Sequence, residues 1–295
     1  MAIITPASAL ASSTFSVTPA FQSASLDASP SVHLTITLSN ETPKDQNFRL
    51  SVADFGSLNE SGGVAFLGEG SSQLDHRYGL ASWLQLNQNV IFVAAGKSAE
   101  IGVTVENRES LAPGGHYGAV LATAVTDTGV PQPLVAQVGV KAVLSSLILL
   151  TKTGGALPQL TLVSETSHHS AAQLPGSVVQ RFQNPGNVHV VPRGVIQIID
   201  PAGRIVASGA LNESSSFILP ESYRKLPVTL SNLAKPWYPG RYVMKTVYRF
   251  DGTDATKTYW ETFWYIGSAA VIVSWIIIAT LFAFGAGWGI RKWRK

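Results

Sequence analysis

The stretch "APGGHYGAVLATAV", residues 112–125, sets a pattern that recurs along the chain. A proline-glycine turn is followed by a run of small and β-branched residues that is typical of a strand. A phosphate-binding loop would open a helix and would place a lysine near the phosphate, and this run does neither. The stretch "WYPGRYVMKTVYRF", residues 237–250, repeats the Pro-Gly turn and the tyrosine. The two stretches therefore predict one module that is used twice.

In each copy, the turn leads to a tyrosine that we expect to form a tyrosine corner, with its ring buried and its hydroxyl bonded to the loop backbone. His116 has no role in this interpretation. The expected turn and corner residues of the two copies are Pro113, Gly114, Tyr117, Pro239, Gly240 and Tyr242.

Short β-rich runs separated by turn residues fill the rest of the chain up to residue 265, without a helical period. Matching runs end in asparagine, "VHLTITLSN" at Asn40 and "QRFQN" at Asn184, and "IIDPAGRIV" (198–206) reads as a hairpin. We predict an all-β protein with two tandem immunoglobulin-like sandwiches, at 12–152 and 153–265. Small-residue patterns in residues 1–11 suggest the remnant of a signal peptide.

The C-terminal run "IGSAAVIVSWIIIATLFAFGAGWGI", residues 266–290, contains no charged residue. As a helix it would rise about 37 Å, enough to cross a hydrocarbon core of about 30 Å. The basic tail, 291–295, should remain in the cytoplasm, so we expect a single-pass protein with its N-terminal part outside. Residues expected at the membrane interface are Trp260, Trp264, Tyr265, Trp288, Arg291 and Lys292. Gly285 and Gly289 could form a helix–helix contact.

Charge and composition exclude several classes of function. Four of the 21 basic residues lie in the last five positions and account for more than the net charge of +3, so the rest of the chain is not a nucleic-acid-binding surface. The chain has no cysteine, which excludes disulfides and thiolate chemistry. No catalytic motif or metal-ligand spacing is present, so we predict a protein that is not an enzyme and needs no cofactor.

A long glycine-rich connection, residues 56–82, is the best binding candidate in the sequence. Long loops on a rigid sandwich often carry recognition. The alternative is that its apolar residues cap the core. The candidate binding residues are Phe66, Leu67, His76, Arg77 and Tyr78.

Several stretches resemble a known group of bacterial surface proteins. "LSNETPKDQNFRLSVADF" (38–55) and "LAPGGHYGAV" (111–120) resemble the first domain of WxL-interacting cell-surface proteins and, more remotely, the immunoglobulin-like domains of pilus chaperones. "NPGNVHVVPRGVIQIIDPAGRIVASG" (184–209) is similar to the membrane-proximal domain of the same surface proteins. The resemblance implies two such domains and a C-terminal anchor, and it transfers no binding residue.

These observations predict a membrane-anchored bacterial protein of the cell surface that holds an extracellular protein or a cell-wall glycan, without catalysis. The alternative is a structural or chaperone-like subunit of an envelope or pilus assembly that acts by β-strand addition. A free edge strand in the first sandwich would favour this alternative. The partner and the oligomeric state do not follow from the sequence.

Overall fold

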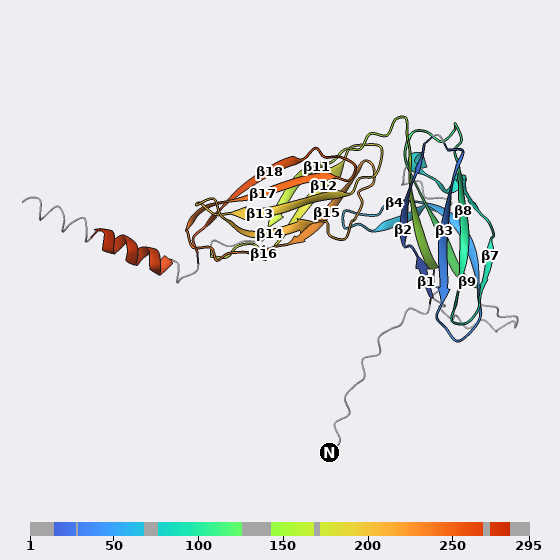
Figure 1. Ribbon diagram of the computed structural model, residues 1–295, viewed down its shortest axis with the longest axis horizontal. Helices are drawn as coiled ribbons and strands as arrows, with labels where there is room; N and C mark the ends of the chain where they lie inside the picture. Colours follow the sequence, from blue (N-terminus) through green and yellow to red (C-terminus); the bar gives the residue numbers. More distant parts are fainter. Residues whose placement is uncertain are drawn as a thin grey trace, which may run out of the picture. The chain divides into compact units, whose positions relative to one another are not determined.

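The computed structural model describes residues 15–27, 29–67, 76–125, 143–167, 172–267 and 272–283. The chain forms two compact units, labelled by strand in Figure 1. The first contains Met1–Gly56 and Val64–Leu157, and the second contains Ser57–Gly63 and Pro158–Lys295. The boundary near residue 157 lies a few residues after the predicted one, and the short segment 57–63 groups with the second unit.

The first unit is a sandwich of two sheets. One sheet has the strand order β1-β3-β8-β6, and the other has the order β2-β10-β9-β4-β5, with β7 also paired to β4. The bounds are β1 Phe15–Thr18, β2 Phe21–Leu26, β3 Ser31–Asn40, β4 Gln46–Ser57, β5 Val64–Leu67, β6 Leu84–Leu86, β7 Val90–Val93, β8 Lys97–Glu106, β9 Gly114–Val125 and β10 Val143–Lys152.

The N-terminal strand of this unit is divided between the sheets. Its first part, β1, pairs antiparallel with β3, and after the cis peptide bond Thr18-Pro19 its second part, β2, pairs parallel with β10. A first strand divided in this way and Greek-key connections are features of immunoglobulin-like sandwiches. The core between the sheets is apolar and includes the fully buried Ile36, Leu38, Phe48, Val105 and Ile148.

The second unit is also a sandwich, of the sheets β11-β12-β15 and β16-β14-β13-β17-β18. The bounds are β11 Thr161–Ser167, β12 Ser177–Asn184, β13 Pro192–Ile199, β14 Ile205–Leu211, β15 Ser222–Thr229, β16 Ser231–Asn232, β17 Gly240–Phe250 and β18 Lys257–Tyr265. The predicted hairpin is present as β13 and β14, around an Asp200 carboxylate that accepts the N–H groups of Ala202 and Arg204.

The two asparagines that end matching strands play the same part in both units. The Asn40 amide donates to the carbonyls of Lys44 and Val93, and its oxygen accepts the N–H of Thr42. The Asn184 amide donates to the carbonyls of Val188 and Ile218, and its oxygen accepts the N–H of Gly186. Both side chains are buried, and each satisfies the backbone of the turn that follows its strand.

Residues 272–283 form a helix that follows the second sandwich. Within the described residues, no helix is long and apolar enough to cross a membrane. Residues 268–271 and 284–295 lie outside the described part, so the span predicted at 266–290 stays a prediction. The all-β class and the two immunoglobulin-like sandwiches are confirmed.

Candidate binding surface

The β2-β10-β9-β4 sheet of the first unit carries apolar side chains on both of its faces. One face packs into the core, and the register places a second set of apolar side chains on the opposite face. We call this second set the apolar outer face; it consists of Phe21, Val90, Phe92, Leu121, Val125, Val143 and Leu147. An antiparallel sheet with one face in water normally carries polar residues there.

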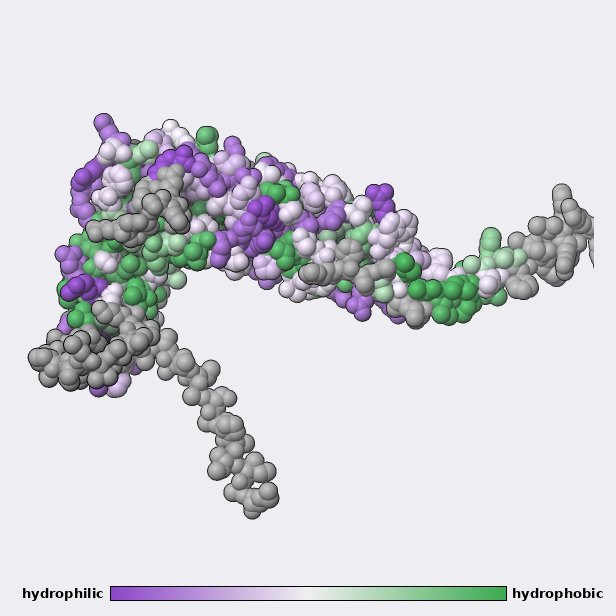
Figure 2. Space-filling model, turned by 180° about the vertical axis from the view of Figure 1, so that it is seen from behind, coloured by the Kyte–Doolittle hydropathy of each residue, from purple (hydrophilic) through white to green (hydrophobic). Residues whose placement is uncertain are grey.

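Four members of the apolar outer face are strongly exposed. Phe92 is 58% exposed, Val90 54%, Val143 52% and Phe21 45%. Figure 2 shows apolar surface on this unit, seen from the side opposite to Figure 1. Clustered exposed apolar residues of this kind mark interaction sites more often than single exposed ones do.

Cross-strand pairing joins these residues into rows. Val90 lies opposite Arg49, Arg49 opposite Thr123, and Thr123 opposite Val143. The exposed Arg49 therefore lies within the row between two exposed valines, where its cation can meet a carboxylate of a ligand. These rows give the face apolar contact area beside the positive charge of Arg49.

Half of one edge of β10 has no partner strand among the described residues, and it lies beside this face. The Leu147 N–H donates to the carbonyl of Ala20, and β2 pairs with β10 only from Leu147 onward. Because backbone groups on one edge recur every second residue, Val143 and Ser145 point the same way. Among the described residues, the Val143–Ser146 half of β10 pairs with β9 alone. This half of the strand thus offers unpaired backbone groups next to exposed apolar side chains.

One edge of the second unit, on β15, is closed. The Lys225 N–H points away from β12 and donates to the carbonyl of Glu60, while the Glu60 carboxylate binds Arg181 and Lys225. The next outward position on this edge is Pro227, which has no N–H to offer. Strand addition at β15 is blocked by these two features.

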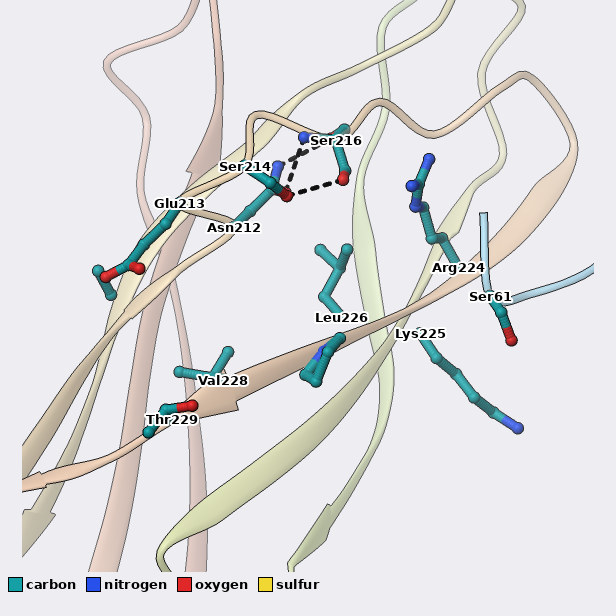
Figure 3. Close-up of a pocket in the computed structure, with 12 residues that line it drawn as sticks. Ser61, Asn212, Glu213, Ser214, Ser216, Arg224, Lys225, Leu226, Val228 and Thr229 are labelled. Carbon is teal, nitrogen blue, oxygen red and sulfur yellow. Dashed lines mark hydrogen bonds between the residues drawn. The ribbon is translucent and has the colours of Figure 1, made fainter. Parts of the chain in front are cut away.

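A hollow of about 400 Å³ lies beside β15 within the second unit (Figure 3). Asn212, Ser214 and Ser216 are hydrogen-bonded to one another on one wall, and Arg224 lies across from them. Arg224 donates to the carbonyl of Phe217, and burial lowers the pKa of its guanidinium. The hollow is framed by side chains that are already engaged in the fold, so it does not extend the free edge described above.

The predicted binding loop is divided between two environments. Leu67 is buried, whereas Phe66 is 40% exposed. The Tyr78 ring lies 6.4 Å from the ring of Tyr117, and the Arg77 guanidinium lies 4.6 Å from the Tyr78 ring. Residues 68–75 and the side chain of His76 lie outside the described part of the structure.

The end of this loop is fixed to the sandwich. The Asp54 carboxylate accepts the N–H groups of Leu80 and Ala81 at 2.7 and 2.6 Å. Leu80 is fully buried in the core. The capping alternative concerned Phe66, Leu67 and Trp83: Leu67 is buried and Trp83 packs against the core, whereas Phe66 is exposed. Binding by Phe66, Leu67, His76, Arg77 and Tyr78 stays a prediction.

The turn and corner residues show which positions correspond in the two units. Gly114 and Gly240 both begin a strand with positive φ, at 125° and 147°. Two residues later, the Tyr242 hydroxyl donates to the carbonyl of Tyr238 at 2.8 Å, which is a tyrosine corner. Two residues after Gly114 stands His116, whose Nε2 lies 2.8 Å from the carbonyl of Ala112. The structure thus places His116, and not Tyr117, at the position of Tyr242.

Tyr117 points to the other face of the sheet. Successive residues of a strand face opposite sides, so the shift by one residue moves the tyrosine out of the core between the sheets. Its ring is nevertheless buried, 5.9 Å from the ring of Phe55. Pro113 and Pro239 precede the two glycines, as the sequence predicts.

The predicted interface residues of the second unit lie on the edge strand β18. Trp260 and Trp264 are 54% and 69% exposed on one face, and Lys245 Nζ lies 5.0 Å from the Trp260 ring. Tyr265 is buried. Trp288, Arg291 and Lys292, with the predicted contact residues Gly285 and Gly289, lie outside the described residues.

Comparisons with known proteins give similar folds at low identity. No family model and no curated protein sequence matches the chain. Among solved structures, it is similar to the class 5 fimbrial chaperone CfaA, with 12% identity, a TM-score of 0.42, and coverage of 84% of this chain and 98% of that one.

Two further chaperone structures are similar to the chain. The complex of the SafA pilin with the SafB chaperone from Salmonella enterica has 11% identity and a TM-score of 0.39, covering 83% of this chain and 95% of that one. The E. coli chaperone DraB has 10% identity and a TM-score of 0.39, covering 83% and 96%. TM-scores this low do not by themselves establish a shared fold. The fold assignment therefore rests on the strand pairing described above. The resemblance to WxL-interacting proteins stays a prediction.

The apolar outer face was missed in the sequence, although a signal for it was present. In "VIFV" (90–93) and in "SLILL" (146–150), apolar residues occupy consecutive positions instead of alternate ones. Such a run predicts a strand that is covered on both faces. Here the second face is left partly exposed, which only the placement of the neighbouring strands reveals.

Proposed function

We propose that the protein is a non-catalytic binding protein whose first sandwich holds an extended segment of a protein partner by strand addition. The observation that carries the proposal is the free edge of β10 at Val143 and Ser145, beside the apolar outer face. This is the chaperone-like alternative drawn from the sequence.

Strand addition combines two kinds of contact. Backbone hydrogen bonds to Val143 and Ser145 supply binding that is independent of sequence. Alternate side chains of the incoming strand then lie beside Val143 and Phe21 and bury their exposed area, at about 25 cal/mol per Å² of apolar surface. The partner is therefore a protein segment with apolar residues at alternate positions.

We also propose that the C-terminal segment tethers the protein to a membrane and that the sandwiches lie outside the cell. In the helix 272–283, large apolar side chains are exposed on every side, including Ile276 at 58%, Leu281 at 67% and Phe282 at 80%. A helix that is apolar all round suits a lipid environment. Alkaline carbonate extraction of native membranes, which releases peripheral proteins, is expected to leave the full chain in the pellet; release into the supernatant would contradict the tether.

Removal of a single backbone N–H group tests the strand-addition proposal. Ser145→Pro removes the outward N–H of β10 at an edge position, where proline is tolerated, and Ser145→Ala keeps it. A photo-crosslinking residue at Val143 in the full chain, expressed in its native host, is expected to capture the partner. The same residue at Val163, an exposed valine of β11, serves as the control.

The captured segment is then synthesised as a peptide and titrated onto the full chain. We expect it to slow amide exchange at Val143 and Ser145, to bind the Ser145→Ala protein normally and to bind the Ser145→Pro protein at least about tenfold more weakly. Equal binding by both variants, or equal capture at Val143 and Val163, would contradict strand addition at this edge.

A second candidate function is glycan binding by the second sandwich. The solvent-facing Trp260 and Trp264 lie on one face of β18 with Lys245 beside them, an aromatic surface on which a sugar ring can stack. Co-sedimentation with purified cell walls tests it. Loss of sedimentation in a Trp260→Ala/Trp264→Ala protein, but not in a Ser145→Pro protein, would support the glycan function; equal sedimentation of all three proteins would exclude this surface.

A further inference from the structure

The core of the second sandwich contains a polar cluster at positions that are otherwise apolar. Gln180 lies between the inward-facing Val178 and Phe182 of β12. Thr246 lies likewise between Met244 and Tyr248 on β17, and Glu261 lies between Tyr259 and Phe263 on β18. Gln180 and Thr246 are both fully buried. Three strands from the two sheets thus direct one polar side chain each to the same region.

A β-bulge adds a fourth polar side chain. On β11, Leu162 pairs with Phe182 and faces the core, but the register shifts before Ser164, which pairs with Arg181. Glu165 therefore pairs with Gln180 and points inward, whereas an unbroken strand would have turned it outward. Bulges often re-aim a side chain next to a functional site.

Hydrogen bonds connect three of the four side chains, and three oxygens of the cluster have no partner among the described residues. Gln180 Nε2 donates to Glu165 Oε2 at 2.5 Å and to Thr246 Oγ1 at 2.6 Å, and the Thr246 hydroxyl donates to the same carboxylate oxygen at 2.9 Å. Among the described residues, Glu165 Oε1, Gln180 Oε1 and Glu261 Oε2 are buried and have no hydrogen-bond partner. Native proteins rarely leave such atoms unsatisfied.

The cluster also holds two carboxyl groups without a basic neighbour. Glu165 and Glu261 are neighbouring carboxyl groups in this cluster, and neither forms an ion pair with a described Lys or Arg. The nearby basic residues face elsewhere, because Lys245 contacts Trp260 on the outer face and Arg181 binds Glu60. Two uncompensated carboxylates in a partly buried site are costly unless a positive charge joins them.

We propose that these four side chains form a binding site for a divalent hard cation, with Ca²⁺ as the best fit. The donors are the carboxylates of Glu165 and Glu261, the Thr246 hydroxyl and the Gln180 amide oxygen. Because Gln180 Nε2 faces Glu165 and Thr246 in this structure, the amide turns over to present its oxygen to the cation. All are oxygen atoms, and two carboxylates balance a charge of +2.

Ca²⁺ fits this set better than the alternatives. Zinc and other transition metals favour nitrogen and sulfur ligands, and no group of three His, Cys, Asp or Glu residues exists in the described structure. Mg²⁺ demands octahedral geometry and retains much of its water. Ca²⁺ accepts irregular sets of oxygen ligands, such as side chains from four strands of two sheets.

The experiment uses the full chain, stripped with EDTA. Ca²⁺ is expected to raise the midpoint of thermal unfolding of the second unit, and Mg²⁺ at equal concentration is expected to raise it less. Tb³⁺, an oxygen-seeking probe for Ca²⁺ sites, is expected to show luminescence sensitised by Tyr259, which lies on β18 two residues from Glu261. Excess Ca²⁺ should quench this signal.

Two substitutions and a control locate the site. Glu165→Gln and Glu261→Gln keep the shape of the side chain and remove one charge each, so each is expected to weaken Ca²⁺ binding at least about a hundredfold. Glu213→Gln, at an exposed glutamate of the same unit, should bind like the wild type.

Other results would overturn the proposal. If Ca²⁺ leaves the wild-type midpoint unchanged, and Glu261→Gln raises it in EDTA, then the two carboxyl groups only share a proton. A Ca²⁺-dependent shift that persists in both Gln variants would place the cation at another site and would equally overturn this one.

Discussion

The two sandwiches of this protein share their turn chemistry and differ at their open edges. Both units end a strand with a buried asparagine, Asn40 or Asn184, that holds the following turn. In the first unit, however, half of the β10 edge has no partner strand among the described residues and lies beside an apolar face, whereas in the second unit the edge of β15 is closed by Glu60 and Pro227.

This difference shows where binding is permitted in a repeated fold. A free edge is an aggregation hazard that proteins usually protect with proline, charge or a covering segment. On β15, the second unit has all three protections: Pro227, the covering segment that contains Glu60, and the charged cluster of Glu60, Arg181 and Lys225. An edge left open in the first unit, beside exposed Val143 and Phe21, is therefore more consistent with a binding role than with a defect of the fold.

The largest expected effect comes from the shared asparagines. Asn40→Ala removes five side-chain hydrogen bonds and Asn184→Ala removes three, and both leave carbonyls unsatisfied. Each is expected to cost about 3 kcal/mol of unfolding free energy in its own unit. Hydrogen–deuterium exchange, resolved by peptide, shows which unit is affected. A loss in only one of the two variants would mean that the asparagines are not equivalent.

The corner residues should show a smaller and unequal effect. His116→Phe removes contacts to the carbonyls of Ala112 and Gly79, and we expect a loss of about 2 kcal/mol in the first unit. Tyr242→Phe removes one hydroxyl bond, and we expect about 1 kcal/mol in the second. Urea unfolding measures both. If Tyr117→Phe proved as costly as Tyr242→Phe while His116→Phe had no effect, the corner would belong to Tyr117.

The polar groups of the second unit should give it a pH dependence with two opposite contributions. A hydrogen bond from Arg181 lowers the pKa of Glu60 from 4.5 to about 2, so this contribution is present above pH 4.5 and is lost as the pH falls toward 2. Burial raises the pKa of Glu165 above 4.5, so its contribution is present below pH 4.5 and is lost as the pH rises through the raised value.

Urea unfolding in EDTA, followed by tryptophan fluorescence, separates these contributions, since all tryptophans except Trp83 lie in the second unit. Glu60→Gln should flatten the acid side of the stability profile, and Glu165→Gln should remove the decline above pH 4.5. A Glu165→Gln profile with the wild-type slope would show that this carboxyl does not titrate as described.

The smallest expected effect on stability is that of the edge proline. Pro227→Val restores an outward N–H on β15, with a change of less than about 1 kcal/mol in unfolding free energy. It should increase self-association in sedimentation experiments, because an edge donor becomes available. Pro30→Val, at an exposed proline in a bend of the first unit, is the control. Identical sedimentation of both variants would show that Pro227 does not protect the edge.

Much of the fold was predictable because β-strands and their turns have local signatures. The strand ends at Asn40 and Asn184 and the Asp200 hairpin were identified correctly from the residues around them, since each of these side chains bonds to the backbone of its own turn. The sequence did not reveal that Asn40 and Asn184 also bond to the distant carbonyls of Val93 and Ile218. The corner was harder. The aligned sequences pair Tyr117 with Tyr242, but the residue that faces the core at this position is His116. The sequence does not show a shift of one position within a strand.

The candidate sites were less accessible from sequence. The interior position of Glu165 depends on a bulge, which the run "TLVSETS" does not reveal. Polar residues within inward-facing runs, such as Gln180 and Glu261, do give a signal, because alternation predicts an apolar residue there. That signal indicates a buried polar group on each strand, without showing that four strands bring these groups together.

The sequence by itself determined the all-β class, the two modules and the turns that bound their strands, because these depend on interactions between residues that are near one another in the chain. Only the tertiary structure decided which edge stays open, which residue fills each corner and which polar side chains meet in the core. The physical reason is that strand pairing joins residues far apart in sequence, and the register of that pairing decides both the face of every side chain and the partner of every backbone group.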